Sequence, residues 1–159
     1  MIEQFRGEYR FLSNFFPATV VLDGQTYASV EAAYQASKSA NSEYRTAIRA
    51  LGEESGAVKR LGRTMTWERR GAGAQYLEAG RTTLRPDWNE ARLSVMLDLV
   101  RQKFTRHADL ATRLLATGQE ELRETNWWRD SFWGVYNGEG ENHLGKILMQ
   151  VRSEIASAA

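Results

Sequence analysis

Four side chains between residues 31 and 38 have types and spacing that could support catalysis. Glu31, Tyr34, Gln35 and Lys38 share one face of a helix, because each residue turns the helix by about 100°. Ser29 is a candidate N-cap that places Glu31 in the first turn, where the helix dipole favours a carboxylate. A carboxylate held there can orient water or stabilise a developing positive charge. A desolvated Lys38 amine could act as a nucleophile.

The alternative interpretation of this face is an ordinary solvated surface, which is more common for polar residues on a helix. Tyr34 weighs against it, because an aromatic ring is an awkward member of a wholly solvated face. Ala32, Ala33 and Ala36 are small neighbours that let the helix pack closely. The spacing alone leaves both interpretations open.

A second candidate segment, residues 126–142, combines tryptophans with Gly, Asn and charged residues, which is typical of a loop. Aromatic rings beside carboxylates can stack on a planar base and hold its sugar, and Asp130 and Trp133 form the most promising pair. Gly140 and Asn142 then lead into a helix, whose first N–H groups favour an anion such as phosphate. Core packing of the aromatics and a simple Gly-rich turn with an N-cap are equally good explanations.

Arginine is used far more than lysine. Only four of the 21 cationic side chains are lysines, and arginine is the better bidentate ligand for phosphate. The candidates for phosphate contact are Arg60, Arg63, Arg69 and Arg70. Compositional bias and ordinary solvation explain these arginines at least as well.

Composition excludes several classes of site. The chain has no cysteine and two histidines, so thiolate nucleophiles, iron–sulfur clusters, Cys-ligated zinc and three-His zinc are ruled out. It has no P-loop, dinucleotide-binding fingerprint or nucleophile elbow. An enzyme of this sequence is therefore expected to work without a metal or cofactor. The formal net charge of +1 supplies no global field for DNA or a membrane.

The N-terminus lacks a basic flank followed by an apolar stretch, so a signal peptide is not expected. No run approaches the ~18 apolar residues of a membrane span. A cytoplasmic location is the resulting expectation, and the sequence leaves the oligomeric state open.

The elements that must position these residues form an α+β fold, a mostly helical single domain of residues 1–159 with a small antiparallel sheet. Asp23-Gly24, between short β-prone runs, predicts a hairpin. Residues 63–85 are expected to be mainly loop, and 122–125 a short strand. From periodicity and end signals, helices are expected over residues 29–40, 42–51, 54–61 (ended by Gly62), 86–104, 108–116 and 142–155.

Several ordered motifs resemble those of the YbiA-like proteins, also called the NADAR superfamily. They cover nearly the whole chain, with residues 63–85 least distinctive. The matching segments are FLSNFFP (11–17), YASVEAAYQASK (27–38), KF (103–104), LLATG (114–118), DSFWG (130–134) and GENHLGKILM (140–149).

The resemblance implies an N-glycosidase that hydrolyses ribosylaminopyrimidine 5′-phosphates of riboflavin biosynthesis and releases ribose 5-phosphate. Related members remove ADP-ribose from guanine, in a nucleoside or in DNA. By motif position, Glu31, Asp130 and Trp133 would be catalytic, and Lys38 matches a lysine that some members use chemically. Many relatives have His directly after the motif Glu, whereas this chain has Ala32. The implied substrate contacts are Asn14, Phe15, Tyr34, Gln35, Arg63, Trp88, Gly140, Asn142 and Gly145.

Cleavage of a C1′–N bond passes through an oxocarbenium-like state, which Glu31 would stabilise or supply with water, with Asp130 as its partner. Trp133 would stack on the heterocycle, and the helix start at Asn142 or nearby arginines would hold the phosphate. The mechanistic alternative is a Schiff base on Lys38.

A binding module for ADP-ribose or a similar nucleotide is the non-enzymatic alternative. The sequence does not decide which heterocycle leaves, nor whether Trp67, Trp127 and Trp128 line the pocket or the core.

Overall fold

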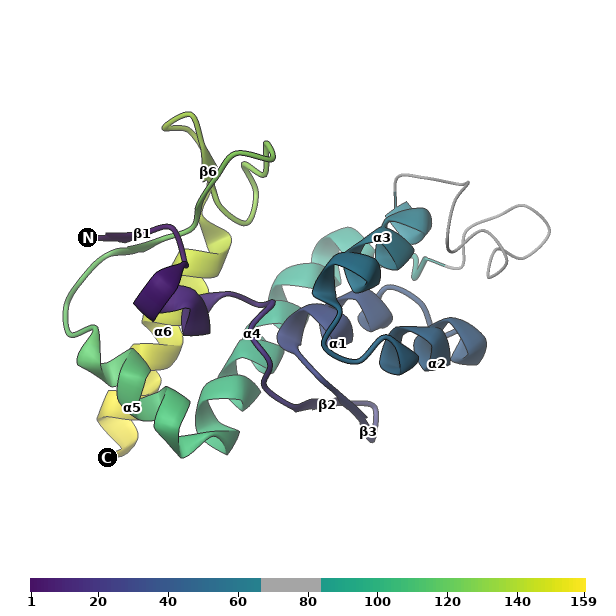
Figure 1. The fold of residues 1–159 in the computed structure, drawn as a ribbon, viewed down its shortest axis with the longest axis horizontal. Helices are drawn as coiled ribbons and strands as arrows, with labels where there is room; N and C mark the ends of the chain where they lie inside the picture. The colour runs from purple at the N-terminus through teal and green to yellow at the C-terminus, as the bar shows by residue number, and fades with distance from the viewer. Residues whose placement is uncertain (67–83) are drawn as a thin grey trace. The chain divides into compact units, whose positions relative to one another are not determined.

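The computed structural model describes residues 1–66 and 84–159, which are mostly helical with small two-stranded sheets (Figure 1). They divide into two compact units, one of residues 17–99 and one of residues 1–16 with 100–159. The α+β expectation is confirmed, whereas a single folding domain stays a prediction. Among the described helices, none has the length and apolar character needed to cross a bilayer.

The predicted hairpin opens the unit of residues 17–99. Strand β2 (Val20–Leu22) pairs antiparallel with β3 (Gln25–Tyr27). Asp23 and Gly24 join them with φ of 47° and 76°, the left-handed conformation that a two-residue hairpin turn needs at both positions. This is the one antiparallel sheet among the described strands.

Helix α1 (Val30–Ser37) is buried along its whole length and packs against α2 (Ser42–Ala50) and α3 (Ser55–Thr66) (Figure 1). Ser29 caps α1 as predicted, because its Oγ accepts from the Ala32 N–H at 3.1 Å. The cap of α2 is Asn41, whose Oδ1 accepts from the Tyr44 N–H at 2.9 Å, and not Ser42 as predicted.

Two predicted helix ends were wrong. Helix α1 stops at Ser37 rather than near residue 40, because the backbone there pairs with a distant segment: Lys38 O accepts from Arg85 N at 2.7 Å, and Ser39 bridges Leu84. Helix α3 continues through Gly62 to Thr66, because Gly62 keeps a negative φ and does not adopt the left-handed conformation with which glycine ends helices.

The remaining helices follow the prediction closely. They are α4 (Trp88–Arg106), α5 (Ala108–Ala116) and α6 (His143–Ala158). Gly118 follows α5 with φ 59°, the conformation expected of a helix stop. Residues 67–83, which include Trp67, Arg69 and Arg70, lie outside the described residues.

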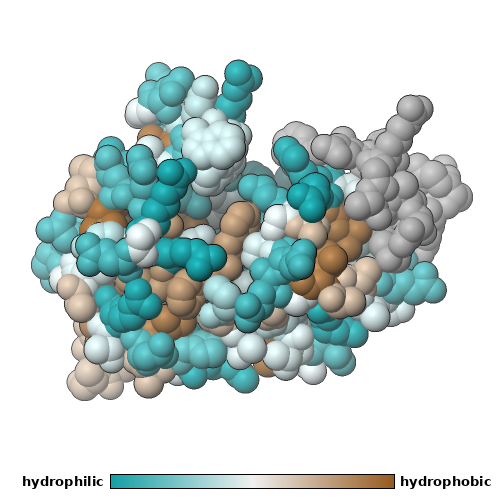
Figure 2. Space-filling model, viewed as in Figure 1, coloured by the Kyte–Doolittle hydropathy of each residue, from teal (hydrophilic) through white to brown (hydrophobic). Residues whose placement is uncertain are grey.

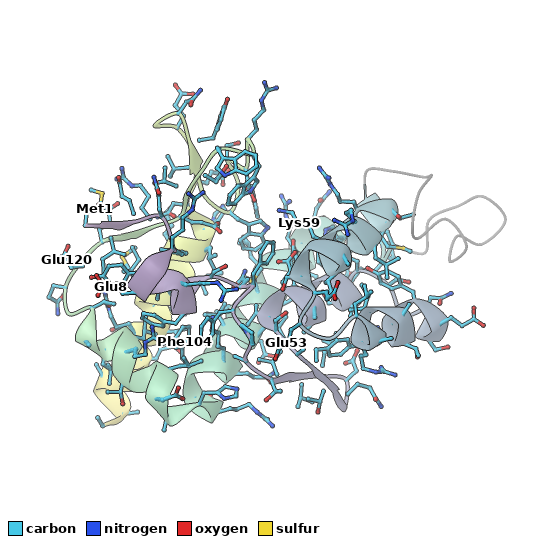
Figure 3. All side chains as sticks on the ribbon, in the orientation of Figure 1. Met1, Glu8, Glu53, Lys59, Phe104 and Glu120 are labelled. Atoms are coloured by element: carbon cyan, nitrogen blue, oxygen red, sulfur yellow. The ribbon has the colours of Figure 1, made fainter. Side chains whose placement is uncertain are left out.

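The unit of residues 1–16 and 100–159 holds two parallel strand pairs. Strand β1 (Ile2–Glu3) pairs with β4 (Leu122–Arg123), and β5 (Thr125–Asn126) pairs with β6 (Val135–Tyr136). Strand β1 leads into a 3₁₀-helix, Gly7–Leu12. The N-terminal amino group beside β1 forms an ion pair with Glu120 beside β4, and Figure 3 shows both residues at this edge. The predicted antiparallel sheet is the β2–β3 hairpin, and these two parallel pairs were not predicted, because pairing between distant segments leaves no local sequence pattern.

A buried lysine lies in the core of this unit. Lys103 is 1% exposed, and its Nζ donates to Ser13 O at 2.8 Å. The amine lies 5.1 Å from the ring centroid of Phe104 and 5.6 Å from that of Phe16. Burial, together with the smaller effect of the nearby Arg113 guanidinium, lowers the pKa of Lys103 to about 7.

This burial makes stability depend on pH in a defined direction. Because the pKa of Lys103 is about 7 in the folded protein and 10.5 ordinarily, the unfolded chain binds more protons between these values. The free energy of unfolding therefore gains up to about 1.4 kcal/mol per pH unit over this range from Lys103. We expect Lys103→Met to remove this gain in urea titrations between pH 7 and 10.

The matched control is Lys146→Met, because Lys146 is an exposed lysine of the same unit. It should follow the wild-type pH profile. Parallel wild-type and Lys103→Met profiles would contradict the assignment to Lys103.

Candidate active site

The predicted polar face of α1 is a buried cluster and not a solvated surface. Glu31, Tyr34, Gln35 and Lys38 are each between 4% and 7% exposed. Trp88, at the start of α4, joins them: its ring centroid lies 5.1 Å from that of Tyr34. The structure thus brings together five of the residues singled out from the sequence. We call them the α1 cluster.

Hydrogen bonds within α1 hold its carboxylate. Gln35 Nε2 donates to Glu31 Oε1 at 2.8 Å, one helical turn away. The backbone oxygen of Gln35 accepts from the Tyr44 hydroxyl of α2 at 2.7 Å, and burial raises the pKa of Tyr44. Tyr44 therefore remains a neutral donor, and the sequence analysis missed this support because nothing local marks it.

Lys38 lies at the end of α1 with its amine among aromatic rings. Nζ is 5.9 Å from the ring centroids of both Tyr34 and Trp88, and it makes a long contact of 3.4 Å to Gly62 O of α3. Burial lowers the pKa of Lys38 to about 8, and Glu31 opposes this shift. A substantial fraction of neutral amine is therefore present near pH 8.

Two cations of α3 act on Lys38 by charge. Lys59, labelled in Figure 3, and Arg63 each lower its pKa. The Arg63 residue is exposed, as a residue that meets a phosphate from solvent must be. Its predicted phosphate contact stays a prediction.

The second predicted constellation is a loop held by reciprocal hydrogen bonds. Asn126 Nδ2 donates to Asp130 O at 2.7 Å, and Asp130 N donates to Asn126 Oδ1 at 3.0 Å. Asp130 Oδ1 in turn accepts from the Phe132 and Trp133 N–H groups at 3.1 and 2.8 Å. The Asp130 carboxylate thus orients the backbone at Trp133, whatever else it does.

The helix start at Asn142 is closed by the chain itself. Asn142 occupies the N-cap position with φ 51°, but its side chain does not cap. Its Oδ1 accepts from Glu124 N at 3.1 Å and its Nδ2 donates to Leu122 O at 3.0 Å. The N–H groups of His143 and Leu144 donate to carbonyl oxygens of residues 132 and 133, so they are not free for the phosphate that the sequence analysis placed there.

Three glycines in and after this loop allow segments of backbone to lie in direct contact. A Cβ on Gly145 would lie 2.1 Å from Leu122 O, and one on Gly140 would lie 2.2 Å from Gly134 O. A Cβ on Gly134 would lie 2.2 Å from Glu124 O. Packing alone therefore explains Gly140 and Gly145, and their predicted substrate contacts stay predictions.

The tryptophans of the loop differ in their surroundings. Trp127 and Trp128 are 73% and 42% exposed, so neither belongs to the core. Trp133 is half-buried, with its ring 4.9 Å from Phe132 in an edge-on arrangement. Figure 2 shows a largely hydrophilic face in which hydrophobic residues form small separate patches.

Asn14 and Phe15 lie in the turn after the 3₁₀-helix. Phe15 is 36% exposed, and its N–H donates to Ser13 Oγ at 3.1 Å. The same Ser13 accepts from buried Lys103 through its backbone oxygen. These two predicted contact residues, with Asp130, Trp133 and Asn142, belong to one compact unit, and the α1 cluster belongs to the other.

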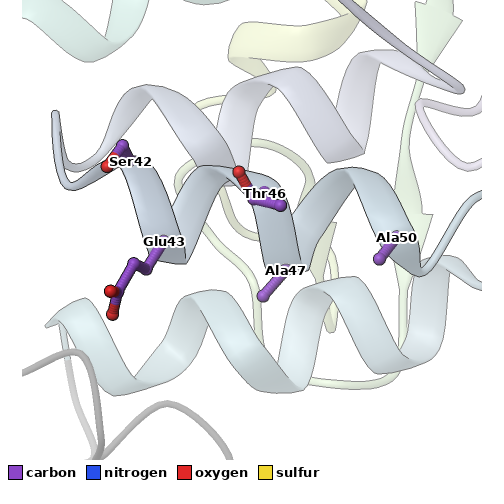
Figure 4. Close-up of a pocket in the computed structure, with 5 residues that line it drawn as sticks. All are labelled: Ser42, Glu43, Thr46, Ala47 and Ala50. Carbon is purple, nitrogen blue, oxygen red and sulfur yellow. The ribbon is translucent and has the colours of Figure 1, made fainter.

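A hollow of about 340 Å³ lies elsewhere, along α2 (Figure 4). Its described lining is Ser42, Glu43, Thr46, Ala47 and Ala50. Glu43 is its only ionisable group among them, and ligand sites need several convergent polar groups. We therefore place the candidate chemistry at the α1 cluster.

Comparison with known proteins places this fold among YbiA-like structures. The solution NMR structure of Escherichia coli YbiA superposes with a TM-score of 0.79 at 30% identity, covering 99% of this chain and 85% of that one. The NADAR domain model matches residues 3–156. The chain belongs to the NADAR domain family.

Curated relatives carry enzymatic names. A Nostoc punctiforme protein named N-glycosidase is 39% identical over 153 residues, covering 92% of this chain and 86% of that protein. A Vibrio vulnificus protein named riboflavin biosynthesis protein is 35% identical over 151 residues. The match covers 94% of this chain but only 36% of the Vibrio protein.

The Asp130 contacts generate a prediction about stability. Asp130→Ala removes the acceptor of two backbone N–H groups, and we expect it to lower the free energy of unfolding by about 1–3 kcal/mol. Asp130→Asn keeps an Oδ1 acceptor and should remain close to wild type. Urea titration of the two variants measures the difference. Equal destabilisation by both would show that the charge, and not the acceptor geometry, holds the loop.

Proposed function

We propose that this protein is an N-glycosidase that hydrolyses the C1′–N bond of ribosylaminopyrimidine 5′-phosphates, intermediates of riboflavin biosynthesis. The observation that carries the proposal is the α1 cluster, a buried carboxylate and a buried amine beside two aromatic rings in a NADAR-family chain. The names of the Nostoc and Vibrio relatives support both the reaction and the pathway.

Glu31 is assigned the central role. In hydrolysis the C1′–N bond breaks, water oxygen bonds to C1′, and one water proton ends on the leaving nitrogen. A carboxylate near C1′ stabilises the positive charge that develops on the sugar and accepts a proton from the attacking water. That proton is the one that ends on the leaving nitrogen, and the second water proton stays on the new C1′ hydroxyl. The Gln35 hydrogen bond holds Glu31 Oε1 and so fixes the orientation of the carboxylate.

Lys38 offers a second route to the same products. Its neutral amine can attack C1′ of the ring-opened ribosylamine, which is an imine. The C1′–N bond to the pyrimidine then breaks, its nitrogen leaves as a protonated amine, and a Schiff base on Lys38 remains, which water hydrolyses to release the sugar. The aromatic rings and the Glu31 charge favour the ammonium form, whereas burial favours the neutral one.

The side chains that complete the substrate site are proposed from the family resemblance and, for Arg63, from the arginine usage of the chain. Trp88 and Tyr34 provide aromatic surface for a planar ring, and Arg63 provides charge for the phosphate. Asp130 and Trp133 are proposed as catalytic partners of Glu31.

The decisive experiment compares two substrates side by side, a ribosylaminopyrimidine 5′-phosphate and ADP-ribosyl-guanosine, with mass spectrometry of the products. We expect ribose 5-phosphate from the first. Release of ADP-ribose alone would instead make the protein an eraser of ADP-ribosylation. Binding of either without cleavage would indicate a nucleotide-binding module.

Replacing the Glu31 carboxylate tests its assignment. Glu31→Gln keeps the size and a hydrogen-bond acceptor but removes the charge, so we expect turnover to fall by about 10²-fold or more. Thermal unfolding should remain close to wild type, because the Gln35 amide still has an acceptor. Full activity in this variant would remove Glu31 from the mechanism.

The two routes differ in their dependence on pH. Because only the neutral amine of Lys38 is nucleophilic and its pKa is about 8, a Schiff-base route predicts a rate that rises through pH 8. The Glu31 route, which we favour, predicts no such rise. Borohydride added during turnover should then leave Lys38 unmodified in peptide mass spectra, and a sugar adduct on Lys38 would reverse the assignment.

The role of Asp130 needs a variant that keeps its loop. Asp130→Asn retains the acceptor for the backbone at residues 132 and 133, so a loss of activity in this variant reports on the charge. We expect turnover to fall by about tenfold or more. Wild-type turnover would reduce Asp130 to a loop-holding residue.

A further inference from the structure

Gly62 occupies the interior of α3, where glycine is unfavourable. A mid-helix glycine destabilises a helix by roughly 0.5–1 kcal/mol relative to alanine. Gly62 is buried and keeps an ordinary helical backbone without positive φ, so no turn conformation requires it. The reason for a glycine must lie in what its missing side chain leaves room for.

That room is filled by Gln35 of α1. A Cβ on Gly62 would lie 1.9 Å from Gln35 Oε1, 2.5 Å from its Cδ and 2.9 Å from its Cγ. Gly56, six residues earlier on the same helix, differs: its Cβ would meet only Arg60 Nη1, at an ordinary 3.8 Å. The close approach is thus specific to Gly62.

The contact fixes which way the Gln35 amide faces. Gln35 Oε1 is buried and has no hydrogen-bond partner among the described residues, and it packs on the bare Cα of Gly62, where a weak C–H···O contact is the interaction open to it. The opposite side of the amide, Nε2, donates to Glu31 Oε1. If the oxygen were displaced, this donor would move with it.

Gly62 also reaches the second ionisable group of the α1 cluster. Its backbone oxygen is the acceptor of the 3.4 Å contact from Lys38 Nζ. One residue of α3 therefore touches the partner of Glu31 through its Cα and touches Lys38 through its carbonyl group.

We propose that Gly62 is a positioning residue: the absence of a side chain lets α3 seat the Gln35 amide so that it orients the Glu31 carboxylate. The inference rests on the proposed function, because it concerns the carboxylate assigned to the reaction. Gly62 does not touch the reacting atoms, and acts through Gln35.

Gly62→Ala tests the proposal, with Gly56→Ala as the matched control on the same helix. We expect Gly62→Ala to lower kcat by about tenfold or more while KM changes little, and Gly56→Ala to leave both unchanged. A Gly62→Ala enzyme with wild-type kcat would overturn the proposal.

A double-mutant cycle assigns the effect to Gln35. Gln35→Ala removes the atoms that the new methyl group would meet, so Gly62→Ala should change kcat by less than about twofold in that background. An equal loss of kcat in both backgrounds would place the effect elsewhere and overturn the proposal. If Gly62→Ala alone fails to fold, we expect the double variant Gly62→Ala with Gln35→Ala to fold. A double variant that also fails to fold would overturn the proposal.

One readout does not need turnover. The ¹⁵N-labelled side-chain NH₂ signals of Gln35, assigned by their loss in Gln35→Ala, should shift in Gly62→Ala and in Glu31→Gln but not in Gly56→Ala. Unshifted signals in Gly62→Ala would overturn the positioning role even if the enzyme acts on another substrate. An inactive wild-type protein with the expected shifts would instead overturn only the proposed function.

Discussion

Burying a carboxylate and an amine on one short helix is the constraint on which the unit of residues 17–99 depends. All eight residues of α1 are buried, and charged groups removed from water need partners or they change protonation. Glu31 takes the Gln35 amide, and Lys38 has two aromatic rings with a distant carbonyl group. A small residue next to α1, such as Gly62, is needed because the Gln35 amide lies so close to α3.

The loop that carries Asp130 and Trp133 must also satisfy polar groups, in this case those of its backbone. It has little regular secondary structure, so its backbone groups are satisfied by side chains such as Asn126, Asp130 and Asn142. Glycines at 134, 140 and 145 then allow backbone to pass within contact of backbone. A loop fixed in this way can present an aromatic ring with little flexibility, which a stacking role at Trp133 would require.

Local sequence signals predicted the elements that local chemistry determines. The Asp23-Gly24 turn, the Ser29 cap and the bounds of α5 all depend on residues within one turn of each other, and all are confirmed. The parallel pairs β1–β4 and β5–β6, the early end of α1 and the passage of α3 through Gly62 depend on distant segments. No periodicity or end signal in the sequence contains that information.

In the candidate site, too, the features set by local sequence were predictable and those set by distant segments were not. Helical spacing placed Glu31, Gln35 and Lys38 on one face, but it did not distinguish a solvated face from a buried one, because both have the same period. The sequence predicts a helix end at Gly62, because glycine is the residue most often found just after a helix. Its role in the close packing on Gln35 is visible only once α1 is placed against α3.

The low pKa of Lys38 shows how the two candidate mechanisms share one structure. Desolvation lowers the pKa of the Lys38 amine, whereas the Glu31 charge raises it. Any loss of the carboxylate charge therefore increases the neutral, nucleophilic fraction of Lys38. In the Glu31 route the same desolvation strengthens the field of the carboxylate at C1′, because charges act further in a water-poor site. The same burial thus makes both Glu31 and Lys38 suitable for catalysis. The form of the sugar that reaches the site determines which of the two acts. A closed ring presents C1′ to the carboxylate, whereas an open chain presents the C1′ imine of the ribosylamine to the amine.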